Sequence, residues 1–282
     1  MFERILVPID GSDFSWAALD QAIELATDEK STLQVLYIVD ERLVEAPFVI
    51  ATYPDTLLAE VHPDLVEMGL QLQKKLQQQG EHLLEQAQAR CEERGIACET
   101  ELAEGNVARI ILDRAEQCQL VVMGRQGAGE KWGGPMLGSV FEAVVRHSPV
   151  PVLGVQREAR PIHRILVAYD GSSRSQDALE IAIGMAKHRG REIVLLTVDD
   201  GRKGREEAYK KAREQLEEAQ VLFTPIYRSG HVAQVILDVA EETHSDLIAM
   251  GAYGHTSFLG ILFGSSVDDV MRRTHLPILI CR

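Results

Sequence analysis

The second half of this 282-residue chain repeats the order of its first half. Arg4-Ile-Leu-Val-Pro-Ile-Asp-Gly-Ser12 returns 160 residues later as Arg164-Ile-Leu-Val-Ala-Tyr-Asp-Gly-Ser172. The closing apolar segments, Pro149–Leu153 and His275–Leu279, correspond at an offset of 126 residues. Repetition at so long a period indicates tandem domains, not a solenoid of short repeats. We therefore expect domains over 1–157 and 162–282, each long enough to bury its own core.

The two copies differ mainly in one crossover segment. Glu104–Asp113 matches Ser229–Asp238 at an offset of only 125 residues, so the first unit has 35 more residues upstream of this match. The enlarged crossover, about 40–95, contains 48–66 and a Gln-rich helical pattern over 70–94. One interpretation is a longer crossover helix packed on the sheet. The other is a lid over a binding site, or a surface for a partner.

Each unit alternates strand patterns with helix patterns. The runs 5–9 and 165–169 are short, apolar and β-branched without alternation, which is typical of strands covered on both faces. Helices should follow, with Ser12 or Asp13, and Ser172 or Ser175, as N-caps and Gly190 ending the second helix. This order predicts the α/β class, with a five-stranded parallel sheet of order 3-2-1-4-5 in each unit and helices on both faces.

Glycine-rich loops follow the predicted fourth strand of each unit. The second unit has Gly251-Ala-Tyr-Gly254, nine residues, and then Gly264-Ser265-Ser266, whereas the first has Gly124-Arg-Gln-Gly127, ten residues, and Gly138-Ser139. Glycines let the backbone approach a bulky anion, and the unpaired N–H groups of a helix start attract negative charge. Both loops therefore predict phosphate-binding sites, in which a Ser265 hydroxyl could contact phosphate, help hold Mg²⁺ or cap the helix.

Two aspartates are expected beside these loops. Asp10 and Asp170 end the first strand of each unit, and ligands of parallel sheets bind beyond the carboxyl ends of the strands, where the strand order reverses. Their carboxylates could accept hydrogen bonds from ribose or an adenine edge, or could only tighten the Asp-Gly-Ser turn. We interpret Asp199 and Asp200 as solvated turn charges and His255 as a residue of the site rim.

Composition limits the other classes of function. A net charge of −14 argues against broad contact with nucleic acid, and any nucleotide site must be built locally from N–H groups or a bound cation. No apolar run is long enough to span a membrane, and no leader precedes the first strand, which predicts a cytoplasmic protein. The four cysteines form no CxxC pair and are expected to be reduced, and the nine histidines show no zinc-ligand spacing.

Other phosphate and catalytic motifs fail. The segment 124–131 matches a Walker A loop only loosely, because Glu130 separates the required Gly-Lys pair. A dinucleotide fingerprint would follow the first strand, where only Asp-Gly-Ser occurs. Neither a Ser-His-Asp nor a Cys-His constellation stands out.

With these motifs on both repeats, the chain resembles a tandem universal stress protein essentially end to end. The ATP-binding signature of that family, G-x2-G-x9-G-[ST], is matched in full by Gly251, Gly254, Gly264 and Ser265. The resemblance implies Rossmann-like domains of the adenine nucleotide alpha hydrolase-like type that bind ATP, or AMP or ADP, with Mg²⁺. In the second unit it assigns the nucleotide to Ala168, Asp170, Val198, Met250, Gly251, Gly254, Gly264, Ser265 and Ser266. In the first unit the corresponding residues are Pro8, Asp10, Ile38, Met123, Gly124, Gly127, Gly138, Ser139 and Val140.

The first unit departs from the family pattern. Ten residues separate Gly127 from Gly138, and this spacer contains Trp132-Gly-Gly-Pro135. An extra residue in a phosphate loop changes the directions of its N–H groups, so we expect the second unit to be the better nucleotide site. The resemblance also implies that the halves pair through their last strands as an intramolecular pseudo-dimer, and it leaves a further homodimer open.

Three hypotheses for function remain. The leading one is a nucleotide-dependent stress-response module that acts through conformational change or an unknown protein partner, without turnover. A slow Mg²⁺-dependent ATPase is the first alternative, although no residue is an evident general base. The second is a scaffold or chaperone that works through 48–66 without nucleotide. A phosphoacceptor receiver domain is disfavoured, since neither unit has the required Asp after strand three or Lys after strand five.

Overall fold

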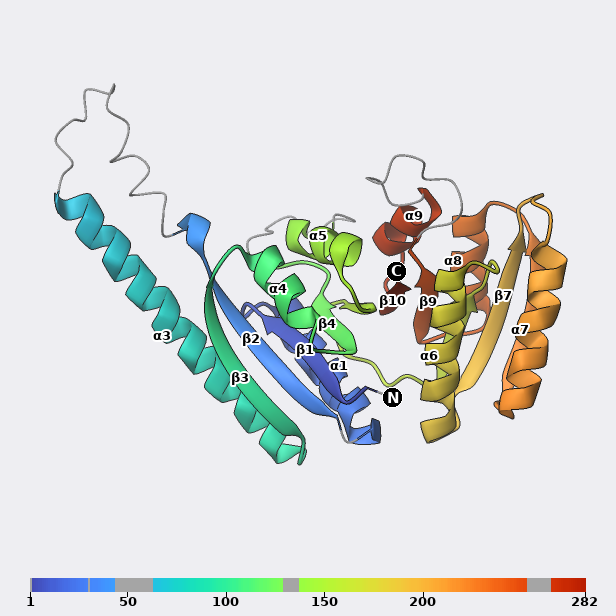
Figure 1. Cartoon of the computed structure of the whole chain (residues 1–282), viewed down its shortest axis with the longest axis horizontal. Helices are drawn as coiled ribbons and strands as arrows, with labels where there is room; N and C mark the ends of the chain where they lie inside the picture. Colours follow the sequence, from blue (N-terminus) through green and yellow to red (C-terminus); the bar gives the residue numbers. More distant parts are fainter. Residues whose placement is uncertain (1, 30, 44–62, 129–136, 253–264) are drawn as a thin grey trace, which may run out of the picture.

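The two halves form one continuous sheet. The computed structural model describes residues 2–29, 31–43, 63–128, 137–252 and 265–282. Its strand order is β3-β2-β1-β4-β5-β10-β9-β6-β7-β8, so each half has the predicted order 3-2-1-4-5 (Figure 1). The strands are β1 (Arg4–Ile9), β2 (Thr32–Asp40), β3 (Ala97–Gly105), β4 (Leu120–Gly124), β5 (Val152–Val155), β6 (Arg164–Ala168), β7 (Glu192–Asp199), β8 (Phe223–Ser229), β9 (Leu247–Gly251) and β10 (Ile278–Cys281).

Helices cover both faces of this sheet. In β1, Ile5, Leu6 and Val7 are all fully buried, as expected for a strand packed on two sides. Ile5 and Val7 belong to the core beneath one set of helices, and Leu6 belongs to the core beneath the other. The first set is α1 (Asp13–Glu29), α3 (Pro63–Glu93), α6 (Ser173–Arg189) and α7 (Arg205–Ala219). The second set is α4 (Val107–Ala115), α5 (Ser139–His147), α8 (Val232–Glu242) and α9 (Ser265–Arg273).

Local capping follows the sequence signals. The Ser12 hydroxyl accepts a hydrogen bond from the Ser15 N–H, and Ser172 accepts the equivalent bond from Ser175, each at 3.2 Å. These two serines therefore act as the N-caps of α1 and α6. Gly190 ends α6 with φ +63°, a left-handed conformation that glycine adopts without strain.

Helix α3 is the enlarged crossover of the first half. It begins at Pro63, earlier than the predicted helix over 70–94, and its Leu84, Ala87 and Cys91 side chains are buried. Near its other end Met68 is 61% exposed, and Figure 1 shows this end extending away from the sheet. The packed part agrees with the crossover-helix interpretation. Most of the segment proposed as a lid or partner surface, 48–62, lies outside the described residues.

Among the residues that the structure describes, no helix combines the length and apolarity needed to cross a bilayer.

The halves meet through antiparallel pairing of their last strands, in which Leu279 of β10 lies opposite Leu153 of β5. A buried arginine adds a second connection. Arg125, only 2% exposed, leaves the glycine loop of the first half, and its Nη1 donates to the carbonyls of Thr274 (3.0 Å) and Leu276 (3.4 Å). Its Nη2 donates to the carbonyl of Met271, in the last turn of α9. Arg125 therefore satisfies carbonyls in the last turn of α9 and in the segment that follows it.

We expect Arg125→Met to lower the free energy of unfolding by about 2 kcal/mol, since hydrogen bonds from a charged group contribute about 1.5–3 kcal/mol each and relief of the buried charge offsets part of the loss. Burial lowers the pKa of Arg125 to about 10, so the guanidinium is still charged at neutral pH. Urea unfolding at pH 7 measures the change. Arg109→Met is the matched control, because Arg109 is exposed on α4. If both variants lose the same free energy of unfolding, the hydrogen bonds of Arg125 to the end of α9 contribute nothing to stability.

Candidate functional site

The Asp-Gly-Ser turns after β1 and β6 have the same geometry. In the first half, Oδ1 of Asp10 accepts hydrogen bonds from the Ser12 N–H (2.9 Å) and the Ser12 hydroxyl (2.6 Å). In the second half, Oδ1 of Asp170 accepts the same two bonds from Ser172, at 3.0 and 2.6 Å. One oxygen of each carboxylate thus tightens the turn. The other oxygen, Oδ2, is directed to different partners in the two halves.

In the first half, Oδ2 of Asp10 meets the glycine loop. It accepts a hydrogen bond of 2.8 Å from the N–H of Ala128. The loop passes so close that a Cβ atom on Gly127 would lie 2.9 Å from the same oxygen, so a side chain there would displace the Asp10 carboxylate. The end of β1 and the loop after β4 therefore converge at one edge of the sheet, although they are more than 110 residues apart.

The first glycine of each loop is required by packing. A Cβ atom on Gly124 would lie 2.8 Å from Cβ of Phe14, and one on Gly251 would lie 2.9 Å from both Cβ of Arg174 and the main-chain nitrogen of Ser175. Neither glycine has a positive φ angle. These residues allow the helix after the Asp-Gly-Ser turn to press on the end of the neighbouring strand, a role that the sequence patterns did not indicate.

Helix α5 begins where the first loop returns to the edge. The N–H of Gly138 donates to the Arg125 carbonyl at 2.8 Å. Gly138 occupies the N-cap position of α5, but it has no side chain that could accept a hydrogen bond from the first turn. The N–H groups of Ser139 and Val140 belong to the first turn of α5, where a helix supplies no acceptor of its own. These N–H groups, together with the helix dipole, can interact with an anion.

The other predicted residues lie along the same strand ends. In the second half, Ala168 of β6 is the register partner of Met250 in β9, and Val198 is buried in β7. Ser266 is half-buried in the first turn of α9. The first-half counterparts are Pro8 in β1, Ile38 in β2 and Met123 in β4. Gly254, Gly264 and His255 lie outside the described residues, as do the side chain of Ser265 and the spacer segment 132–135.

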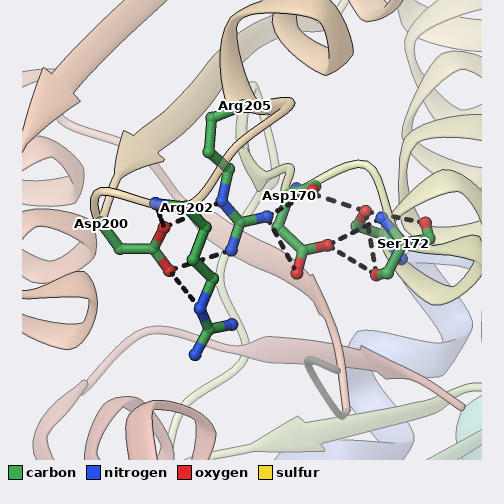
Figure 2. A network of polar contacts seen from close by, with 6 residues as sticks. Asp170, Ser172, Asp200, Arg202 and Arg205 are labelled. Carbon is green, nitrogen blue, oxygen red and sulfur yellow. Dashed lines mark hydrogen bonds and ion pairs between the residues drawn. The ribbon is translucent and has the colours of Figure 1, made fainter. Parts of the chain in front are cut away.

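A network of charges that the motifs did not reveal adjoins Asp170 (Figure 2). Arg205, at the start of α7, donates to the main-chain carbonyl of Asp170, and its Nη1 lies 3.4 Å from Oδ2 of that residue. Its Nε and Nη2 donate to the two carboxylate oxygens of Asp200, at 3.1 and 3.0 Å. Nε of Arg202 lies 3.3 Å from Oδ2 of Asp200, the same oxygen that accepts from Nη2 of Arg205. Arg205 therefore joins the carboxyl ends of β6 and β7.

These contacts keep the carboxylates charged. For Asp170, burial favours the neutral form, but hydrogen bonds from Ser172 and Ser175 and the charge of Arg205 outweigh it and hold the pKa below its ordinary value. Hydrogen bonding by Arg205 is the main cause of the lowered pKa of Asp200, and the same bonding raises the pKa of Arg205. The arginine is therefore a permanent cation between two ionised acids.

The interpretation of Asp200 as a solvated turn charge is wrong. Its side chain is only 15% exposed and pairs with the buried Arg205. The sequence does hold a signal for this site. Asp40-Glu-Arg42 returns as Asp200-Gly-Arg202 at the same offset as the Asp-Gly-Ser turns, and Arg42 also pairs with Asp40 in the first half, at 2.6 Å. Within the described ranges, no three His, Cys, Asp or Glu side chains are arranged to hold a metal ion.

Comparisons with known proteins agree on one family. The model of the Universal stress protein family matches residues 1–156 and 161–282. The universal stress protein Slr1230 of Synechocystis is 25% identical over 286 residues, covering 99% of this chain and all of its own. YxiE of Bacillus subtilis is 34% identical over 161 residues, covering 55% of this chain and its own full length. A universal stress protein of Archaeoglobus fulgidus shares the fold, with a TM-score of 0.74, 23% identity, and coverage of 99% of this chain and 96% of that one.

Proposed function

The chain belongs to the universal stress protein family, and we propose that it binds an adenine nucleotide at the carboxyl edge of its sheet and works as a nucleotide-dependent regulatory module in a stress response. The observation that carries the proposal is the contact between Asp10 and the glycine loop. It supports a site in which one edge offers a carboxylate for ribose and main-chain N–H groups for phosphate. The repeated Asp-Gly-Ser geometry extends the proposal to Asp170.

The second half is proposed as the stronger site. There the family signature Gly251, Gly254, Gly264 and Ser265 is complete, whereas the first half has one residue too many in its loop. Arg205 contributes by keeping Asp170 ionised and in place, so that this carboxylate can accept a ribose hydroxyl. Mg²⁺ would enter with ATP, held mainly by the phosphate oxygens.

Nucleotide would act by shifting a population of conformations. Binding can shift the equilibrium between two conformations of the protein only by the difference in the nucleotide's affinity for them. The glycine loops are the segments proposed to change conformation, since each connects the nucleotide-binding edge of the sheet to the following helix, α5 or α9. In the first half this loop also carries Arg125, which contacts the end of α9. A change at the first edge would therefore reach the second half through this arginine.

The proposal predicts that Asp170→Asn weakens ATP binding about tenfold, because an amide replaces a charged acceptor whose hydrogen bond is worth about 1.5–3 kcal/mol. Asp10→Asn is the matched change in the first half and should have the smaller effect. Isothermal titration of the full chain with ATP and Mg²⁺ measures both. No binding by the unaltered protein, or equal affinities for it and Asp170→Asn, would contradict the proposal.

Phosphate release from the same samples separates binding from hydrolysis. A regulatory module should bind ATP stoichiometrically without sustained release of phosphate. Release above that of a Gly264→Val variant would assign the chain to the ATPase alternative instead. The two results can be compared directly, because both measurements use the same protein preparation.

A further inference from the structure

Two of the four cysteines are brought together by the turn between α3 and β3. Cys91 lies in the last turns of α3, and Cys98 is the second residue of β3. The chain reverses between them at Gly95, with φ +68°, and the N–H of Ile96 donates to the Cys91 carbonyl at 2.9 Å. This 6→1 bond is the closing bond of a Schellman turn, which fixes how the strand leaves the helix.

The two side chains meet on the same side of the sheet. Cys98 pairs in register with Leu33 of β2, which belongs to the core that also contains Cys91. Cys98 packs, partly buried, against this core, so both side chains face the same layer, and each affects the pKa of the other. Cys91 is fully buried, whereas Cys98 is partly exposed. Cys118 differs from this pair, because its thiol faces the side-chain oxygen of Gln34, at 3.6 Å.

We propose that Cys91 and Cys98 form a reversible disulfide when the protein meets a peroxide or a small-molecule disulfide. Both cysteines are free thiols in this structure. Neighbouring thiols of which one is accessible form the arrangement that peroxide-sensitive proteins use, with an attacking and a resolving cysteine. The cysteine pair shares no residue with the proposed nucleotide site.

The order of attack follows from exposure, because Cys91 is buried and Cys98 is partly exposed. The neighbouring Cys91 side chain lowers the pKa of Cys98, whereas interaction with Cys98 and burial raise the pKa of Cys91. With hydrogen peroxide, the Cys98 thiolate attacks one oxygen, the O–O bond breaks, and Cys98 becomes a sulfenic acid as hydroxide leaves. The sulfur of Cys91 then attacks the Cys98 sulfur, and its proton and the sulfenic hydroxyl leave as water. In sum, two thiols and one peroxide give one disulfide and two waters.

The bond would fasten the end of α3 to the start of β3. Helix α3 also packs on the proposed site of the first half, where a Cβ atom on Gly11 would lie 3.1 Å from Leu83. Oxidation would therefore restrain the helix that covers the Asp10 turn. A higher thermal midpoint of the oxidised protein, reversed by dithiothreitol, is the expected consequence.

The test uses the full-length folded chain. It is exposed to hydrogen peroxide or oxidised glutathione, remaining thiols are alkylated in denaturant, and the digest is read by mass spectrometry. We expect a peptide linked between Cys91 and Cys98, lighter by two hydrogen atoms and absent after dithiothreitol. The matched control, Cys118→Ser, should give the same linked peptide.

Cys98→Ser separates the proposed chemistry from general oxidation. This residue is only partly buried, so the variant should fold, which circular dichroism checks. In it Cys91 should remain alkylatable after oxidant, because the accessible attacking thiol is gone. The proposal is overturned if native protein yields no linked peptide while Cys98 accumulates sulfinic acid or stays glutathionylated. It is also overturned if Cys91 oxidises equally in Cys98→Ser.

Discussion

Replacing Arg205 by methionine should lower the free energy of unfolding by about 3 kcal/mol, the lower part of the range for removing one partner from a buried ion pair. The arginine side chain is 10% exposed and contacts both Asp170 and Asp200. Methionine conserves much of the buried volume but removes the cation that Asp170 and Asp200 share, so that Asp200 keeps only its contact with the more exposed Arg202. The lower value is expected because Asp170 is 31% exposed, and water can hydrate it in part.

Arg202→Met is the matched control for this prediction. Arg202 touches the same Asp200, but its side chain is 50% exposed, so its loss should cost less than about 1 kcal/mol. Denaturant unfolding at pH 7 measures both variants. Comparable losses for the two would mean that burial of Arg205 does not strengthen its contacts.

The effect of Arg205→Met should also depend on pH in a defined direction. The folded pKa values of Asp170 and Asp200 are lowered, so their contribution is complete above the unfolded value, about 3.9, and is lost as the pH falls through the folded values. The difference in stability between wild type and variant should therefore shrink below about pH 4. A difference that stays constant into acid would place its origin in packing instead of charge.

Gly251→Ala should destabilise the protein by about 2 kcal/mol, within the range for overpacking a close contact. The added methyl group would lie 2.9 Å from Ser175 N and 3.0 Å from the main-chain carbon of Arg174. Because these are backbone atoms, the start of α6 must move away from β9. That movement displaces the Asp170 turn, so ATP affinity should fall together with stability.

Matched variants show whether the contact is the cause. Gly124→Ala meets Phe14 in the same way in the first half and should cost a similar amount, with less effect on ATP binding. Lys187→Ala, on the exposed face of α6, should change stability by no more than about 0.5 kcal/mol. Unfolding curves and ATP titrations are measured on all three variants. A tolerated Gly251→Ala would show that α6 can shift without cost.

Several parts of this architecture follow from local patterns. The runs predicted at 5–9 and 165–169 fall in the buried strands β1 and β6, the second of which ends at Ala168. Ser12, Ser172 and Gly190 cap helices as their residue types predict. The alternation of strand and helix patterns predicted the sheet of order 3-2-1-4-5 in each half. These features depend on neighbours within a few residues, or on the alternation of strands and helices, which a sequence displays directly.

Side-chain contacts between elements that are distant in sequence could be identified only from the folded structure. The sequence around Arg205 does not distinguish it from an exposed arginine. In the structure Arg205 is buried and donates to the carbonyl of Asp170, which lies 35 positions earlier in the chain. The same is true of Arg125, whose acceptors lie about 150 residues further along the chain. For Gly251 the pattern suggested phosphate, and the structure adds steric contact with α6.

Residue order and periodicity are enough to establish the duplication, the α/β class, the edge at which Asp10 and Asp170 lie, and the family resemblance. They do not reveal which charges are buried together, at which glycines a side chain would meet backbone atoms, or which cysteines lie close together. Those features depend on distances between elements remote in sequence, and such distances are set by packing of the whole sheet and its helices.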